Sequence, residues 1–148
     1  MHDPGTDMKM KPLEQLLLDL FRELGLHQPA RILPGWSLSL SEFLALNVLA
    51  SRAPLSQREL GCELSLEKST ISRLVDQLEQ RGWITPMRDL QDNRLCLLYL
   101  SEQGQSIALQ LQQRLHEHYQ GLFSQLGPGE RQALTNGLAA LFKLLEPA

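Results

Sequence analysis

The polar side chains between residues 67 and 80 are of the kinds that bind anions and hydrogen-bonding edges. Arginine can pair bidentately with guanine, serine and threonine can bond to bases or to phosphates, and lysine neutralises phosphate. The side chains of these kinds, with one amide, are Lys68, Ser69, Thr70, Ser72, Arg73 and Gln77. They lie off an apolar stripe at helical spacing, which consists of Ile71, Leu74, Val75 and Leu78. A helix that is merely solvated on its polar side has the same composition, so the neighbouring elements must decide what this segment does.

The segment before residue 67 carries two clear helix starts. Their capping boxes are Ser39 with Glu42 and Ser56 with Glu59. The first predicts a helix that ends near Arg52. The second predicts a short helix that leads through about three residues into the helix over 67–80, a connection typical of a helix-turn-helix. In that motif the second helix enters the major groove of DNA.

The hydrophobic period changes after Gly82, which is placed to end the helix over 67–80 with a left-handed C-cap. Residues 83–88 and 95–100 predict two short strands, and the turn-rich sequence between them predicts a hairpin. The second strand is apolar throughout, and we expect it to lie against the core. A hairpin directly after the second helix is the wing of a winged helix-turn-helix.

Leucine-rich helical patterns flank this central part. On the N-terminal side, a polar segment is followed by a helical pattern over residues 13–24 that ends near Gly25. The residues that then break the chain are Pro29, Pro34 and Gly35. On the C-terminal side, Ser101 caps a long helix predicted to about Leu126. A last helix follows Gly127, with Pro128 placed to open it.

These elements predict a mainly α-helical fold with a small β-hairpin wing, in which a winged helix-turn-helix is flanked by N- and C-terminal dimerisation helices. The predicted parts are an N-terminal segment (1–11), a first helix and linker (12–36), the winged helix-turn-helix (37–100) and the C-terminal helices (101–148). One chain has little left to cover the leucines of the terminal helices. An enlarged monomeric core is one interpretation, and a dimer interface built from both chain ends is the favoured one.

Two stretches of this chain resemble the MarR family of bacterial regulators. The run LSQRELGCELSLEKSTISRLVDQLEQRGWI resembles the family's DNA-binding core. The run Asp92-Asn93-Arg94, with the later Leu100-Ser101-Glu102-Gln103-Gly104, is similar to its wing signature. The resemblance implies that Arg94 reaches into the DNA minor groove, with Asp92 holding it in place and Arg88 at the start of the wing. An ordinary turn ion pair of little energetic value is the alternative for Asp92 and Arg94.

The resemblance implies a homodimeric transcriptional repressor on a palindromic operator of double-stranded DNA, with half-sites about one DNA turn, roughly 10 bp, apart. Relatives commonly release DNA when a small, often aromatic or phenolic anion binds between the dimer helices and the winged domain. Such a ligand must prefer the conformation whose recognition helices no longer match the half-sites. The candidate ligand-binding residues are His27, Arg31, Trp36 and Phe43. Each of them also fits a plain structural role.

The charge of the chain excludes a polycationic, generally sticky nucleic-acid binder. Its net charge is −3 at pH 7, and residues 51–94 contain seven basic and seven acidic residues. Binding must therefore come from how the charges are arranged. The family usually carries paired basic residues at the start of the wing, where this chain has Pro86 and Met87 and leaves Arg88 alone. We expect few phosphate contacts and a shallow dependence of affinity on salt.

Two rival functions fit parts of the same pattern. A metal- or thiol-responsive regulator of the same fold would use cysteines or histidines. We expect Cys62 to pack in its helix and Cys96 in a wing strand, and His116 and His118, two residues apart, to point to different faces of a helix. A helical adaptor would use the polar face of residues 67–80 to bind protein instead of DNA.

Other classes are excluded by missing motifs. The chain has no glycine-rich phosphate loop, nucleophile elbow or HExxH motif, so we predict no enzyme, no cofactor and no metal. Two cysteines are too few for a disulfide-rich scaffold or a four-thiolate zinc site. The N-terminal residues carry charges and prolines where a signal peptide needs an apolar stretch, and no apolar run nears the roughly 20 residues that span a bilayer. We expect a cytoplasmic protein.

Overall fold

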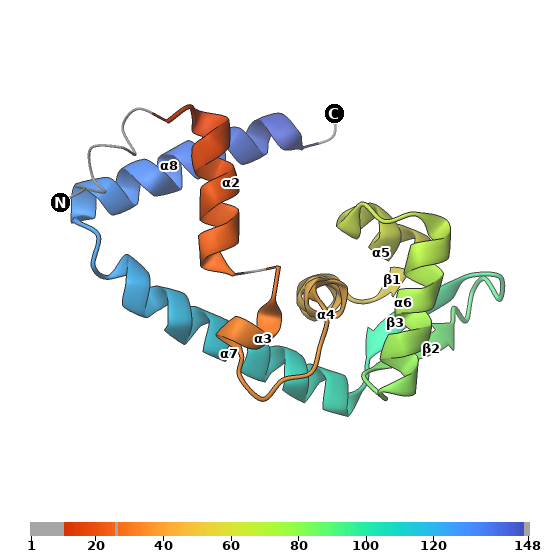
Figure 1. The fold of residues 1–148 in the computed structure, drawn as a ribbon. Helices are drawn as coiled ribbons and strands as arrows, with labels where there is room; N and C mark the ends of the chain where they lie inside the picture. The colour runs from red at the N-terminus through yellow and green to blue at the C-terminus, as the bar shows by residue number, and fades with distance from the viewer. Residues whose placement is uncertain (1–10, 26, 147–148) are drawn as a thin grey trace. The chain divides into compact units, whose positions relative to one another are not determined.

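The computed structural model describes residues 11–25 and 27–146 (Figure 1). It is mainly helical with a small antiparallel sheet, which confirms the predicted fold class. The chain divides into two compact units, residues 1–112 and 113–148, and the boundary falls within one long helix. No helix in the described ranges has the length and apolar character that spanning a bilayer requires.

The first unit begins with helix α2 (Leu13–Leu24), which ends as predicted at Gly25 in the left-handed conformation, with φ of 71°. The one-turn helix α3 (Pro29–Ile32) follows, where the sequence predicted only a broken chain. Pro29 is the first residue of α3. Proline suits this position because its φ is already helical and because the N–H that it lacks would have had no partner in the helix.

Both predicted capping boxes are formed. Helix α4 (Leu40–Arg52) begins after Ser39, whose Oγ accepts from the Glu42 N–H at 3.1 Å while Glu42 Oε1 accepts from the Ser39 N–H at 3.1 Å. Helix α5 (Gln57–Leu64) begins after Ser56, which makes the same reciprocal pair with Glu59 at 3.1 and 3.2 Å. Each box satisfies two backbone N–H groups that a helix start otherwise leaves unpaired.

Helix α6 (Lys68–Gln80) packs on α4, α5 and the sheet through its apolar stripe, whose four residues are all buried. The helix ends as predicted at Gly82, which has φ of 75°. The N–H groups of Gly82 and Trp83 donate to the carbonyls of Glu79 and Leu78 at 2.9 and 3.0 Å. This is a Schellman motif, and it turns the chain directly from α6 into the wing.

The sheet has the strand order β1-β3-β2 and is antiparallel throughout. Strands β2 (Ile84–Arg88) and β3 (Cys96–Leu100) form the predicted hairpin. Strand β1 (Leu55–Ser56) was not predicted, and it adds to the free edge of β3, with Leu55 opposite Leu98. Two residues are too few for a periodic pattern, and both lie where the sequence signals the start of α5.

The prediction that the whole of β3 lies against the core is wrong. Leu98 and Leu100 are buried, whereas Cys96 is exposed and Leu97 and Tyr99 are half-buried. Leu97 and Tyr99 point to the face opposite to that of Leu98 and Leu100, and the helices of the first unit cover only one face of this sheet. Cys96 shares the face of Leu98 and Leu100, but it lies at the end of the strand beside the wing loop, opposite Arg88. The apolar composition of β3 concealed that alternation.

Helix α7 (Glu102–Phe123) starts in close contact with the end of α6. Ser101 Oγ accepts from the Gly104 N–H at 3.0 Å and donates to the Gly82 carbonyl, and the Ser101 N–H donates to the Trp83 carbonyl at 3.0 Å. A Cβ at Gly104 would lie 1.9 Å from the Trp83 carbonyl oxygen. A glycine is therefore required here by the space available and not by its φ.

The second unit contains the end of α7 and helix α8 (Pro128–Leu145), which Pro128 opens as predicted. Helix α7 ends at Phe123, before the predicted Leu126. The Gly121 carbonyl there accepts from Ser124 Oγ at 3.0 Å and Gln125 Nε2 at 3.2 Å. In a continued helix, the Gly121 carbonyl would accept from the Gln125 N–H. Here it accepts from the two side chains, and the Gln125 N–H donates to the Leu122 carbonyl.

The close approach at Gly104 predicts a strong effect of one added methyl group. We expect Gly104→Ala to lower the free energy of unfolding by about 1–3 kcal/mol or more, because the backbone of Trp83 cannot yield without moving the end of α6. Gly121→Ala is the matched control, since it lies in the same helix with nothing within 4 Å of its added Cβ. It should be neutral or stabilising by up to about 1 kcal/mol. Urea unfolding followed by circular dichroism measures both, and equal effects would contradict the packing argument.

Candidate nucleic-acid interface

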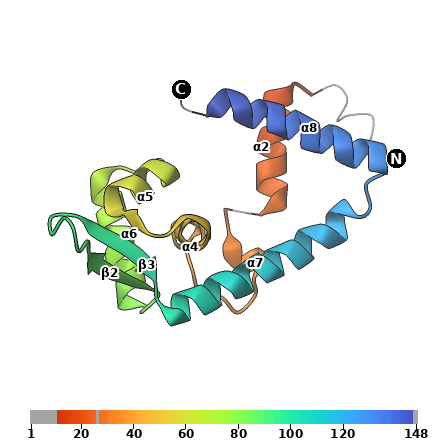
Figure 2. The same ribbon diagram turned by 180° about the vertical axis from the view of Figure 1, so that it is seen from behind.

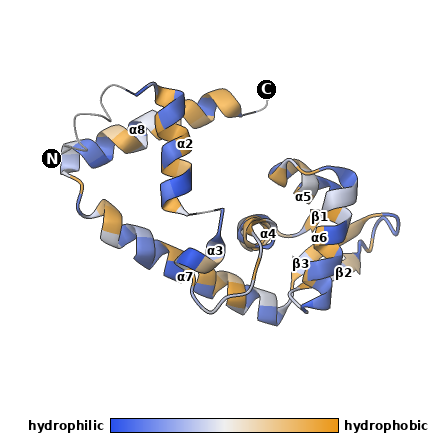
Figure 3. Ribbon diagram, viewed as in Figure 1, coloured by the Kyte–Doolittle hydropathy of each residue, from blue (hydrophilic) through white to orange (hydrophobic). Residues whose placement is uncertain are grey.

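Helix α6 presents the predicted polar face to solvent. Of the residues predicted to contact DNA from this helix, Ser72 is half-buried and the others are exposed, namely Lys68, Ser69, Thr70, Arg73 and Gln77. The apolar stripe holds the opposite side of α6 against the core. Hydrophilic residues recur along α6 (Figure 3). The polar face is therefore a surface of the first unit and not part of its interior.

The turn between α5 and α6 brings the two helices close together. Ser65 adopts the left-handed conformation, with φ of 53°, and the Leu66 N–H donates to the Gly61 carbonyl at 2.9 Å. Gly61 is buried, and a Cβ there would lie 3.4 Å from Ile71 Cγ2. The start of α6 thus lies against the middle of α5, which is the arrangement of a helix-turn-helix.

The start of α6 differs from those of α4 and α5. Glu67 precedes the helix, and its side chain makes no capping hydrogen bond. The N–H groups of the first turn of α6 are thus not capped by the N-cap side chain. Uncapped N–H groups at the positive end of a helix dipole favour anions such as phosphate.

The loop of the β2–β3 hairpin projects beyond α6 in both views of the chain (Figures 1 and 2). Asp92 Oδ1 accepts from the Arg94 N–H at 3.1 Å, and the Leu95 N–H donates to the Asp92 carbonyl at 3.0 Å. Asp92 thus holds the backbone of Arg94, and no ion pair joins the two side chains within the described ranges. An aspartate that bonds its own backbone two residues on is a common turn device.

Arg88 also braces the wing, since its guanidinium donates to the Asn93 carbonyl at 2.6 Å. Its predicted contact with DNA stays a prediction, and one of its N–H groups is already used inside the protein. Leu90 lies in the same loop with 99% of its surface exposed. Nothing in the sequence marks this leucine, because one apolar residue in a polar turn follows no pattern.

The basic residues of segment 51–94 divide into two groups. Arg52 pairs with Glu63, Arg81 pairs with Glu42, and Arg88 is bonded to the wing. The exposed members that form no ion pair or side-chain hydrogen bond with any described residue are Arg58, Lys68, Arg73 and Arg94. All four lie on α5, on α6 or in the wing.

Several acidic residues of the same segment are occupied by internal contacts. Glu59 caps α5, Glu63 pairs with Arg52, and Asp89 accepts from the Gln91 N–H at 3.1 Å. Asp92 is bonded to Arg94 as described above. Glu67, Asp76 and Glu79 are exposed and form no ion pair or side-chain hydrogen bond with any described residue. The formally neutral segment therefore presents four unpaired cations and three unpaired anions around the helix-turn-helix.

A charge pair ties the end of α6 to the start of α4. Arg81 Nε lies 2.7 Å from Glu42 Oε2, although not in hydrogen-bonding geometry, and the Arg81 guanidinium carbon lies 4.5 Å from the centroid of the Trp83 ring. Glu42 is only 5% exposed, and its other oxygen belongs to the capping box of α4. A buried carboxylate keeps its charge at low cost only when a cation faces it. The sequence predicts only the capping-box role of Glu42, because Arg81 is far from it along the chain and no sequence pattern relates the two residues.

The four candidate ligand residues lie in the segment from the end of α2 to α4. His27 is half-buried, with its ring 5.4 Å from that of Phe21, and its Nδ1 is buried without a partner among the described residues. Phe43 is a core residue, Trp36 is half-buried and Arg31 is exposed. None of the described pockets of the first unit is lined by these residues. Their role in ligand binding stays a prediction.

The prediction that Cys62 packs within its helix is wrong. Both Cys62 and Cys96 are free and exposed. Cys62 lies on the outer side of α5. Cys96 lies in the wing strand β3 as predicted, but at its end beside the wing loop, so it is not packed there. His116 and His118 are exposed as well, and no group of three potential metal ligands occurs in the described part of the chain. The alternative of a thiol-responsive regulator therefore stays open.

A helix-turn-helix with an exposed, uncapped second helix and a hairpin directly behind it defines a winged helix-turn-helix DNA-binding protein. Residues 38–96 match the model of the MarR family. The transcriptional repressor MprA of Escherichia coli (strain K12) is 31% identical over 94 residues, which are 62% of this chain and 53% of that relative. The uncharacterized HTH-type transcriptional regulator YpoP of Bacillus subtilis (strain 168) is 26% identical over 110 residues, which are 74% of this chain and 77% of that relative.

Solved structures show the same fold. FabT of Streptococcus pneumoniae in complex with DNA has a TM-score of 0.78 at 20% identity, covering 90% of this chain and 94% of that one. A mutant of MarR from E. coli has a TM-score of 0.73 at 23% identity, covering 90% of this chain and 98% of that one. Residues 38–96 form a MarR-family DNA-binding domain, and the chain is a transcriptional regulator, like the relatives and structures that it resembles, which are not enzymes.

The Asp92–Arg94 hydrogen bond predicts different effects for two substitutions at the same position. Asp92→Ala removes the acceptor that holds the wing loop, and we expect DNA affinity to fall about 2- to 10-fold, the value of one hydrogen bond. Asp92→Asn keeps a carbonyl acceptor and removes a negative charge, so it should bind at least as well as the unaltered protein. Fluorescence anisotropy with a duplex selected from a random pool measures both. Equal losses in the two variants would show that the charge, and not the hydrogen bond, matters.

Proposed function

We propose that this protein is a homodimeric repressor that binds a palindromic operator and is released from it by a small ligand. The exposed and unpaired polar face of α6, with the wing beside it, is the single observation that carries this proposal. The residues of α6 that contact DNA are Lys68, Ser69, Thr70, Ser72, Arg73 and Gln77, and the wing contributes Arg88, Asp92 and Arg94. Arg94 enters the minor groove, where a narrow A·T-rich groove deepens the negative potential. A regulator that binds an operator acts on the chromosome, so the proposed location of the protein is the cytoplasm.

The terminal helices support the dimer. No residue of α2 or of α8 is buried, although both are rich in leucine. Leu13 on α2 is 68% exposed and Leu144 on α8 is 83% exposed. Apolar surface of this extent is a usual sign of an interface. A second copy of the chain covers it in a two-fold symmetric contact, and the two-fold axis makes the operator a palindrome.

The ligand is a small aromatic or phenolic anion. A solved structure of Bordetella bronchiseptica BpsR, with a TM-score of 0.73 at 19% identity over 93% of this chain and 96% of that one, concerns regulation of its DNA binding by 6-hydroxynicotinic acid. In this chain, His27 Nδ1, which has no partner among the described residues, and the half-buried Trp36 suit such a ring, and Arg31 and Phe43 are the other candidates. The ligand acts by favouring the conformation in which the two α6 helices no longer match the operator.

Two arginine substitutions test the proposed DNA contacts. Arg94→Ala should weaken binding to a selected duplex about tenfold or more, because one good contact is worth roughly 1–3 kcal/mol. Arg73→Ala should also relax the sequence preference. Gel shifts with selected and scrambled duplexes across a salt series measure both effects. Unchanged affinity in Arg94→Ala removes Arg94 from the interface, and an absence of salt-dependent binding in the unaltered protein would favour the protein-binding adaptor.

A charged substitution on α8 tests the dimer. Phe142 is 62% exposed, and Phe142→Glu should convert the dimer to a monomer without loss of helical content, because a carboxylate cannot be desolvated in an apolar contact. Leu90→Glu is the control, since it introduces the same charge at an exposed apolar residue of the wing. Light scattering after size-exclusion chromatography reports the mass of each variant. A monomeric unaltered protein, or a dimer in both variants, contradicts the role of α8.

A further inference from the structure

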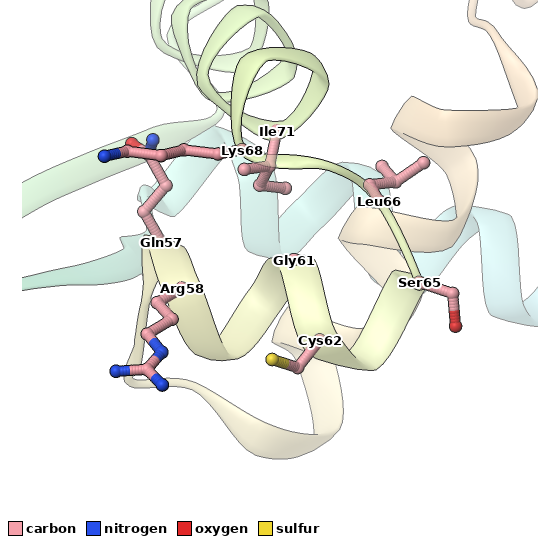
Figure 4. Close-up of a pocket in the computed structure, with 8 residues that line it drawn as sticks. All are labelled: Gln57, Arg58, Gly61, Cys62, Ser65, Leu66, Lys68 and Ile71. Atoms are coloured by element: carbon pink, nitrogen blue, oxygen red, sulfur yellow. The ribbon is translucent and has the colours of Figure 1, made fainter.

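A pocket of 660 Å³ lies between α5 and the start of α6. Gln57, Arg58 and Cys62 line it from α5, and Lys68 lines it from the first turn of α6 (Figure 4). Arg58 and Cys62 are four residues apart on α5, so they lie on the same side of that helix. The pocket has room for far more than one water molecule. None of these residues except Lys68 was predicted to take part in binding.

The pocket is lined by two cations and by no acidic residue. Arg58 and Lys68 are exposed, and neither forms an ion pair or a side-chain hydrogen bond with another residue in the described ranges. The two acidic residues of α5 are engaged elsewhere, since Glu59 caps the helix and Glu63 pairs with Arg52. The pocket is therefore a local positive site within a segment that has no net charge, and its lining suits an anion.

The position of the pocket identifies that anion as a phosphate of DNA. Lys68 begins the helix whose exposed face carries Ser69 and Arg73, so the pocket adjoins the face that reads bases. In a helix-turn-helix the first helix crosses the DNA backbone while the second enters the groove. The start of the wing, with Pro86 and Met87, offers little positive charge, so backbone contacts must come from elsewhere on the domain.

We propose that Arg58 and Lys68, with the amide of Gln57, form a phosphate-binding site that fixes the DNA backbone beside the reading face of α6. This inference rests on the proposed DNA-binding function. Arg58 supplies a planar guanidinium that can donate two parallel hydrogen bonds to one phosphate, and Lys68 supplies a second charge. A phosphate contact positions the protein and reads no sequence. Lys68 therefore contributes to affinity and not to the choice of bases.

The first test compares arginine substitutions over a salt series from about 50 to 200 mM. We expect Arg58→Ala to weaken binding to selected and scrambled duplexes by the same factor, about tenfold, and to reduce the salt slope by roughly 1. Arg58→Lys should keep the slope and recover part of the affinity. Arg114→Ala, which removes an exposed arginine of α7, is the control and should change neither quantity. An unchanged slope in Arg58→Ala overturns the site, whereas absent binding by the unaltered protein overturns the proposed function instead.

The second test uses the thiol of Cys62, which lies in the pocket itself. In a Cys96→Ser background, Cys62 is modified either with a sulfonatoethyl or with a trimethylammonioethyl methanethiosulfonate reagent. The two adducts are of similar size and opposite charge. We expect the sulfonate adduct to weaken DNA binding at least tenfold, about the value of one phosphate contact, and the ammonium adduct to preserve it. Bound DNA should also slow the labelling of Cys62. Equal loss with both adducts, or no loss with either, overturns a phosphate in this pocket.

Discussion

One short backbone segment, from Arg81 to Ile84, fixes the relative positions of α6, the wing and the start of α7. The left-handed Gly82 turns the chain out of α6, and Ser101 bonds to the carbonyls of Gly82 and Trp83. Gly104 approaches Trp83 so closely that no side chain fits between them. The end of the recognition helix, the start of the wing and the start of α7 are thereby fixed to one another. A displacement of any one of these elements must move the other two.

The same segment connects the proposed DNA-binding surface to the start of α4. Arg81 lies against the buried Glu42 and over the Trp83 ring, so the start of α4 is joined to the end of α6 by a charge pair. Phe43, one of the residues proposed to meet a ligand, follows Glu42 directly. A ligand that shifts the start of α4 would act on this pair before it acts on any base contact. If the protein is the ligand-released repressor proposed above, this pair gives the coupling between its two sites a short physical route.

The cations that are available to bind DNA are determined by the internal ion pairs and hydrogen bonds of this protein, and not by its net charge. Segment 51–94 is neutral, and its internal pairs occupy Arg52, Arg81 and Arg88. They leave four exposed cations on the helices and the wing, beside the exposed acidic residues Glu67, Asp76 and Glu79. Desolvation and competition decide which cations can meet phosphate, since an arginine already bonded within the protein must give up a partner first. Net charge is therefore a poor guide to nucleic-acid binding in a chain of this composition.

The sequence by itself determined the features that depend on neighbours along the chain. The capping boxes at Ser39 and Ser56, the buried stripe of α6 and the turn at Gly82 each need only a few consecutive residues, because helix ends and helix faces are local. The hairpin and its wing signature are local for the same reason. These features were enough to predict the fold class and the polar face of α6.

The tertiary structure alone decided which distant residues meet. Strand β1 exists only because β3 offers it a free edge, and Glu42 faces Arg81 only because α4 and α6 are packed together. The exposure of Cys62, the alternate burial along β3 and the pocket that joins Arg58 to Lys68 likewise depend on what covers each surface. Composition and spacing cannot supply this information, since a side chain's burial and partners are set by packing between segments far apart in the chain.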